Sequence, residues 1–84
     1  DKDWDNQILQ DNNYNLYLKY SKYGIVTLKE INPENAKILS VTRIFNHANP
    51  IKIKIHNNDV YFIKRNYITD SFELFKFPLN EPSF

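Results

Sequence analysis

A predicted β-hairpin over residues 51–65 constrains the fold of this chain more than any other feature. Isoleucine alternates with lysine or histidine over residues 51–56, which is the period of a strand with one buried face. Asn57 and Asn58 follow, and asparagine tolerates the positive φ angles that tight hairpin turns require. A second β-rich run begins at Val60. The sequence therefore predicts a mainly β fold.

The rest of the chain divides into short β-rich runs separated by turn signals. Gly24 is the only glycine, Asn32-Pro33-Glu34-Asn35 is a strong turn sequence, and Pro50 and Pro78 interrupt regular structure. The strands are expected over residues 14–21, 25–31, 37–45, 51–56, 60–66 and 72–77.

A short helix is expected near the N-terminus, over about residues 3–10. Trp4, Ile8 and Leu9 have helical spacing. Asp1, Asp3 and Asp5 crowd the expected helix start, where acidic side chains favour the positive end of the helix dipole.

Chain length and loop length together predict one small domain over residues 1–84. The connections between the six expected strands are short, which favours antiparallel neighbours because parallel crossovers need about a dozen residues. We therefore expect a small antiparallel meander sheet or a partly closed barrel of about six strands, with the N-terminal helix covering one face.

Composition argues against most catalytic and cofactor-binding classes. The chain has no cysteine and a net charge of +1, and its single glycine is too few for a phosphate-binding loop. His47 and His56 have no nearby cysteine or paired acidic residues, and neither has a recognisable nucleophile arrangement. The N-terminal aspartates resemble the start of a calcium loop, but Asn6 and Asn12 stand where that loop needs glycine and glutamate. No catalytic residue, metal or cofactor is predicted.

The chain contains no methionine, and it is rich in asparagine, isoleucine and lysine. The residue usage is typical of an AT-rich genome. Because translation begins with methionine, we expect a segment before Asp1 to have been removed. A trimmed extracytoplasmic protein is expected on this basis, such as a small lipoprotein, an inhibitor or immunity-type protein, or an anchored ectodomain. The expected location is periplasmic, at the cell surface or secreted.

Aromatic residues give the best sequence signal for a binding surface. Tyrosine is enriched at protein interfaces, where it supplies contact area and a hydroxyl group. Two lysines on the strand over residues 51–56 would add charge complementarity. We expect a non-catalytic domain that binds another protein, in the cell envelope, and the predicted partner-binding residues are Tyr14, Tyr17, Tyr20, Tyr23, Lys52 and Lys54.

Single-stranded nucleic-acid binding is the alternative function. Lys52, Lys54, Lys64, Arg65 and Lys76 lie on neighbouring predicted strands. Aromatic residues are interleaved with them, and a basic sheet that carries aromatic side chains is suited to stacking and tracking a single strand. Acidic residues in the same region dilute this patch, and lysine is also the ordinary outward residue of a solvated strand.

Overall fold

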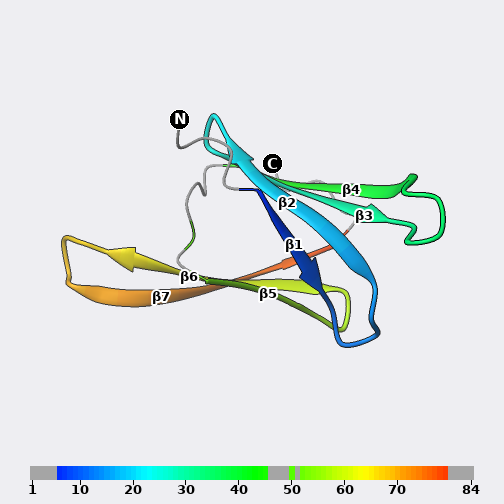
Figure 1. Cartoon of the computed structure of the whole chain (residues 1–84). Helices are drawn as coiled ribbons and strands as arrows, with labels where there is room; N and C mark the ends of the chain where they lie inside the picture. The colour runs from blue at the N-terminus through cyan, green and yellow to red at the C-terminus, as the bar shows by residue number, and fades with distance from the viewer. Residues whose placement is uncertain (1–5, 46–49, 51, 80–84) are drawn as a thin grey trace.

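The computed structural model describes residues 6–45, 50 and 52–79, which form two antiparallel sheets and, within those ranges, no helix. One sheet has four strands in the order β1-β2-β3-β4, and the other has three in the order β5-β6-β7 (Figure 1). The strands are β1 (Gln7–Gln10), β2 (Leu16–Lys22), β3 (Ile25–Ile31), β4 (Ile38–Phe45), β5 (Lys52–His56), β6 (Asp59–Asn66) and β7 (Ser71–Pro78).

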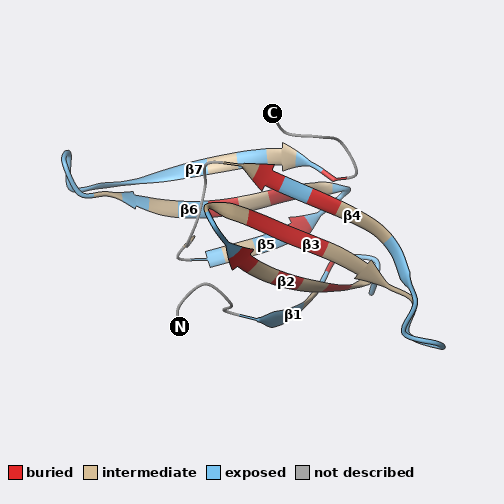
Figure 2. Ribbon diagram, turned by 90° about the horizontal axis from the view of Figure 1, so that it is seen from above, coloured by how far each residue is buried: buried red, intermediate tan, exposed pale blue. Residues whose placement is uncertain are grey.

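The two sheets form two layers, and the hydrophobic core lies between them (Figure 1). Figure 2 shows that buried residues gather in the middle of the strands, whereas the β3–β4 and β6–β7 turns extend beyond the core and are exposed. Alternate residues of each strand face the core, as the two-residue period requires. The buried hydrophobic residues are Tyr17, Val26, Leu28, Ile44, Ile55, Val60, Phe62 and Leu79.

The hairpin predicted over residues 51–65 is confirmed over residues 52–65, and Ile51 lies outside the described residues. Strands β5 and β6 pair antiparallel, with His56 opposite Asp59. Asn57 and Asn58 have φ angles of 49° and 65°, so the two-residue turn uses the left-handed conformation that asparagine adopts more readily than most residues.

The predicted N-terminal helix is wrong over the part of it that the structure describes. Gln7–Gln10 form strand β1 and pair with β2, with Ile8 opposite Leu18 and Leu9 opposite Tyr17. Pairing with β2 gives these backbone groups hydrogen-bond partners and brings Leu9 against the core, so tertiary pairing overrides a weak helical pattern. Trp4, Asp1, Asp3 and Asp5 lie outside the described residues.

The alternative of a partly closed barrel is also wrong, because the described strands form no closed barrel and no hydrogen-bonded strand pair among them joins the two sheets. The simple meander is corrected as well, since the seven strands of the described residues divide between two sheets. Within each sheet the strands do follow chain order. Strands β1 and β5 are neighbours at one open side of the sandwich, but each belongs to a different sheet.

Two hairpin turns from different sheets are connected by asparagine side chains. The Asn12 side-chain amide donates to Oδ1 of Asn57 at 2.8 Å, and the Asn57 backbone N–H donates to Oδ1 of Asn12 at 2.9 Å. The backbone N–H of Leu79 donates to the carbonyl oxygen of Asn58 at 2.9 Å. These bonds hold the β1–β2 turn, the β5–β6 turn and the end of β7 together at one end of the sandwich.

Replacing Tyr23 with asparagine is expected to stabilise the protein by about 1 kcal/mol, because Tyr23 occupies the left-handed region with φ 53°. With Gly24 at φ 75°, the substitution creates the Asn-Gly sequence that this two-residue turn prefers. Urea denaturation measures the change, and Tyr23→Phe is the control because it keeps the backbone cost. Equal midpoints for the asparagine variant and wild type would contradict the assigned strain.

Candidate functional site

The four tyrosines predicted to form a partner surface do not lie on one surface. Tyr17 is only 3% exposed and faces the core, whereas Tyr20 is half-buried on the opposite face of β2. Tyr14 and Tyr23 are each 80% exposed, but they stand at opposite ends of β2, which spans roughly 30 Å with its flanking residues. The structure therefore leaves no continuous tyrosine patch that a single partner face would cover.

Tyr17 stabilises the fold instead. Its hydroxyl donates to Oδ2 of Asp11 at 3.1 Å. Burial is the largest influence and raises the pKa of the Tyr17 hydroxyl well above its ordinary value, and the hydrogen bond to Asp11 and the charges of Asp11 and Glu30 raise it further. A buried, hydrogen-bonded tyrosine of this kind holds the fold rather than contacting a partner.

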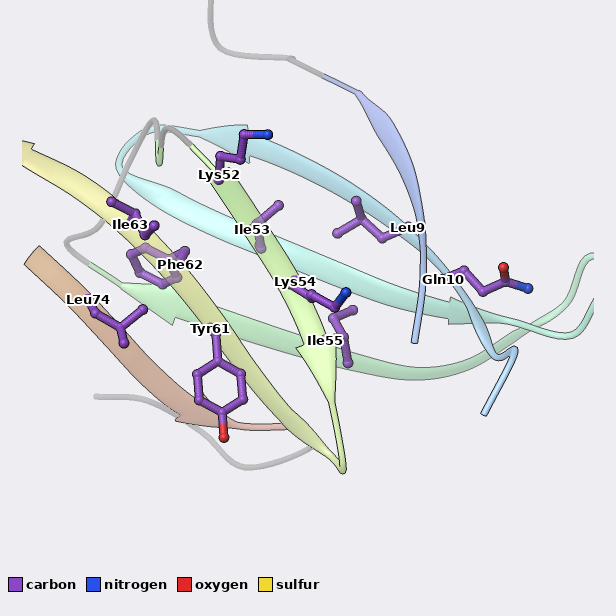
Figure 3. Close-up of a pocket in the computed structure, with 10 residues that line it drawn as sticks. All are labelled: Leu9, Gln10, Lys52, Ile53, Lys54, Ile55, Tyr61, Phe62, Ile63 and Leu74. Atoms are coloured by element: carbon purple, nitrogen blue, oxygen red, sulfur yellow. The ribbon is translucent and has the colours of Figure 1, made fainter. Parts of the chain in front are cut away.

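Lys52 and Lys54 are exposed, and they line a groove of about 480 Å³ beside the edge of β5. Leu9 and Gln10 of β1 contribute to the same groove, which therefore lies where the two sheets adjoin. Figure 3 shows Leu9 and Ile53 projecting into the space between β1 and β5. We call this site the β1/β5 groove. Its lining residues are Leu9, Gln10, Lys52, Ile53, Lys54, Ile55, Tyr61, Phe62, Ile63 and Leu74.

The chemistry of the β1/β5 groove follows from strand alternation. Ile53 and Ile55 face the core side of the sheet, where Phe62 also lies, while Lys52 and Lys54 face the other side. The two lysines are the charged residues of the lining set, which contains no aspartate or glutamate. The groove is therefore an apolar site with a positively charged rim.

The outer face of the three-stranded sheet continues from this rim. Lys54 lies opposite Tyr61, which in turn lies opposite Lys76, and the Lys76 ammonium is 6.0 Å from the centroid of the Tyr61 ring. Lys76 also contacts Asp59, with 3.7 Å between Nζ and Oδ2. At the far end of the sheet, the Arg65 guanidinium lies over the rings of Tyr67 and Phe72 and pairs with Asp70.

A second apolar surface lies on the outer face of the four-stranded sheet. Tyr20 belongs to it, and the Lys29 ammonium is 5.4 Å from the centroid of the Tyr20 ring. No strand of the described residues covers this face (Figure 2). Its half-buried or exposed apolar residues are Ile8, Leu16, Leu18, Tyr20, Ile25, Ile31, Ile38, Val41 and Phe45.

The structure assembles no metal-binding cluster within residues 6–45, 50 and 52–79. His56 stands beside the hairpin turn opposite Asp59, as the sequence predicts, and His47 lies outside the described residues. In the part of the chain that the structure covers, no helix is long and apolar enough to cross a membrane.

The sequence predicts Lys52 and Lys54 as site residues and places Tyr61 among the aromatic residues interleaved with them, but it gives no sign of Leu74 as their neighbour in the groove. The signal for Tyr61 was present, because a two-residue turn at Asn57 and Asn58 fixes Lys54 opposite Tyr61. Leu9 had no usable signal, since the residue lies on a strand that was expected to be a helix.

The sequence matches no protein-family model, and no curated protein resembles it at a significant level. The functional conclusion therefore rests on the geometry of the molecule.

Proposed function

We propose that this is a non-catalytic protein-binding domain and that the β1/β5 groove is its binding site. The observation that carries the proposal is the composition of the groove, which combines apolar walls with Lys52 and Lys54 and contains no acidic side chain. Apolar area provides affinity on binding, and exposed charge directs association and orientation. Small inhibitors and immunity-type proteins, which act by covering another protein, are the class that this proposal includes.

The surface that we propose differs in part from the one expected from the sequence. Lys52 and Lys54 remain in the proposed site, whereas the tyrosines of the β2 region are replaced by Tyr61 as the aromatic contact. Tyr61 is half-buried, and the Lys76 ammonium lies 6.0 Å from the centroid of its ring, so the ring has less freedom to lose than a fully exposed one. Pre-positioned aromatic side chains lose little entropy on binding.

Site-specific photo-crosslinking tests the proposed site. A photoreactive phenylalanine analogue is placed at Lys54 in the groove, at Tyr20 on the other apolar face, or at Glu34 in the exposed β3–β4 turn, and each variant is irradiated in an extract of its native cells. We expect a discrete protease-sensitive adduct from position 54 and none from position 34. Excess wild-type protein should suppress the adduct, and the Lys52→Glu/Lys54→Glu variant should not.

Two other outcomes would change the binding surface or the class of partner. An adduct from position 20 without one from position 54 would move the interaction to the four-stranded sheet. A nuclease-sensitive adduct from position 54 would replace protein binding with nucleic-acid binding.

Single-stranded nucleic-acid binding remains the second candidate, and the row Lys54–Tyr61–Lys76 is the observation that favours it. An aromatic ring flanked by two cations is suited to a stacked base between phosphates. Two of the cations on this face are paired with Asp59 and Asp70, which reduces the charge available to phosphates. Affinity for an oligothymidine that falls steeply with salt, and that is lost in Tyr61→Ala, is the result that this candidate requires.

A further inference from the structure

We propose that the edge of β5 binds an extended peptide segment as an additional strand, and that apolar and acidic residues alternate in this segment. The inference rests on the proposed function, because it names the class of partner that the β1/β5 groove accepts. Strand addition to a sheet edge is a general mode of peptide recognition, in which backbone hydrogen bonds supply affinity and alternate side chains supply specificity.

Among the strands that the structure describes, β5 pairs with β6 alone, and its other edge faces the groove. Strand β1 is its neighbour on that side but belongs to the other sheet. In a two-residue turn, the hydrogen bond joins the residues that flank it, here His56 and Asp59. Because bonded residues alternate along an antiparallel strand, Lys52, Lys54 and His56 bond toward β6. The N–H and C=O groups of Ile53 and Ile55 therefore point toward the groove.

The side chains around this edge determine which peptide fits. A strand added beside β5 places every second side chain on the core side, against Leu9, Ile53 and Ile55. The intervening side chains lie on the outer side, next to Lys52 and Lys54. Apolar residues fit the first set of positions, and aspartate or glutamate fits the second.

The same lysines argue against a second copy of this chain as the occupant. Edge pairing of two β5 strands would bring the lysines of one copy next to those of the other, and like charges on adjacent strands are destabilising. Lysine on an edge strand is a common device against such self-association. A partner that carries acidic residues converts this repulsion into attraction.

A designed peptide of about seven residues tests the proposal. In it valine alternates with glutamate, both ends are capped, and a fluorescent label reports binding to the full chain by anisotropy. We expect saturable binding to the wild type, and a loss of at least about tenfold in affinity for the Lys52→Glu/Lys54→Glu variant. A counterpart peptide with lysine in place of glutamate should show the reverse preference between the two proteins.

Backbone methylation separates strand addition from simple side-chain docking. Two further peptides carry N-methyl groups either on all valine amides or on all glutamate amides, and these two sets of amides point to opposite edges of a strand. Strand addition requires that one methylated peptide loses at least about tenfold in affinity while the other binds like the parent peptide. The amides of Ile53 and Ile55 should also exchange hydrogen more slowly when the parent peptide is bound.

The other outcomes overturn the proposal in distinguishable ways. Equal affinity for both methylated peptides would mean docking through side chains alone, and the groove would remain a protein-binding site. Absence of peptide binding, together with a protein adduct at position 54, would reject strand addition but keep the proposed function. Absence of both would reject the two together, and displacement of the peptide by oligothymidine would assign the groove to nucleic acid.

Discussion

Replacing Phe62 with alanine is expected to lower the free energy of unfolding by about 3–5 kcal/mol. Phe62 is 1% exposed, and its ring centroid lies 5.4 Å from that of Phe75 and 5.4 Å from that of Phe77. The alanine variant loses the buried area of the ring and leaves a cavity between the sheets. Because small domains are stable by only about 5–15 kcal/mol, this loss removes a large fraction of the total stability, and the urea midpoint of the variant should fall well below that of the wild type.

Urea denaturation followed by tryptophan fluorescence or circular dichroism measures this loss. Phe72→Ala is the matched control, since Phe72 lies on the neighbouring strand β7 but is 68% exposed. Its substitution should change stability by about 1 kcal/mol or less, because an exposed ring contributes little burial. Similar losses of stability for the two variants would contradict the position of Phe62 at the centre of the core.

The strand positions were predictable from the sequence because turn chemistry and alternation agree along most of the chain. Strand β3 occupies Ile25–Ile31, the range expected from the turn at Gly24 and the proline turn that follows. The β5–β6 hairpin was equally readable, since its asparagine turn and its alternating isoleucines indicate the same register. Division into two sheets was not readable, because it depends on contacts between residues far apart in the sequence.

The direction in which β2 faces was also beyond the sequence. One set of alternate residues in this strand is Leu16, Leu18 and Tyr20, which is more apolar than the other set, so the alternation favours burial of the wrong face. In the structure the core-facing set is Tyr17, Lys19 and Ser21, although lysine is rarely buried to this degree. The hydrogen bond between Tyr17 and Asp11 stabilises this orientation. No local sequence pattern predicts that bond.

The candidate site was predictable only in part for the same reason. Lys52 and Lys54 stand out because they alternate with isoleucine on one strand. The opposite wall of the groove comes from Leu9 and Gln10, which are more than 40 residues away in the chain. A site formed between two sheets requires the packing of those sheets to be known first.

Replacing Asp11 with alanine is expected to destabilise the protein by about 2–4 kcal/mol. Asp11 is 7% exposed, and Oδ1 accepts hydrogen bonds from the backbone N–H groups of Asn13 and Asn15 at 2.8 and 2.9 Å. Oδ2 accepts from the Asn15 side-chain amide at 2.9 Å and from the Tyr17 hydroxyl at 3.1 Å. Removing one carboxylate thus deprives four donors of their acceptor. Asp70→Ala, which breaks an exposed pair with Arg65, should cost about 1 kcal/mol or less.

The same carboxylate gives stability a defined dependence on pH. Burial alone would raise the pKa of Asp11, but the hydrogen bonds from Asn15, Asn13 and Tyr17 outweigh it and hold the pKa below the ordinary value of 3.8. The unfolded chain therefore binds a proton at Asp11 more readily than the folded chain does. This contribution to stability is fully present above about pH 5 and is lost as the pH falls below 3.8 and through the lower folded value.

Comparing wild type with Asp11→Asn across pH 2–7 isolates this contribution from those of the other carboxylates. The difference in unfolding free energy between the two proteins should shrink as the pH falls below about 4, because protonated Asp11 has no charge to stabilise. At alkaline pH the effect comes from Tyr17, whose raised pKa means that it ionises in the unfolded chain near pH 10.0 but stays neutral in the folded one. Wild type should therefore lose stability above pH 10 more steeply than Tyr17→Phe does. Parallel profiles for these two proteins would show that the Tyr17 hydroxyl titrates freely and that its bond to Asp11 does not hold the β1–β2 turn in place.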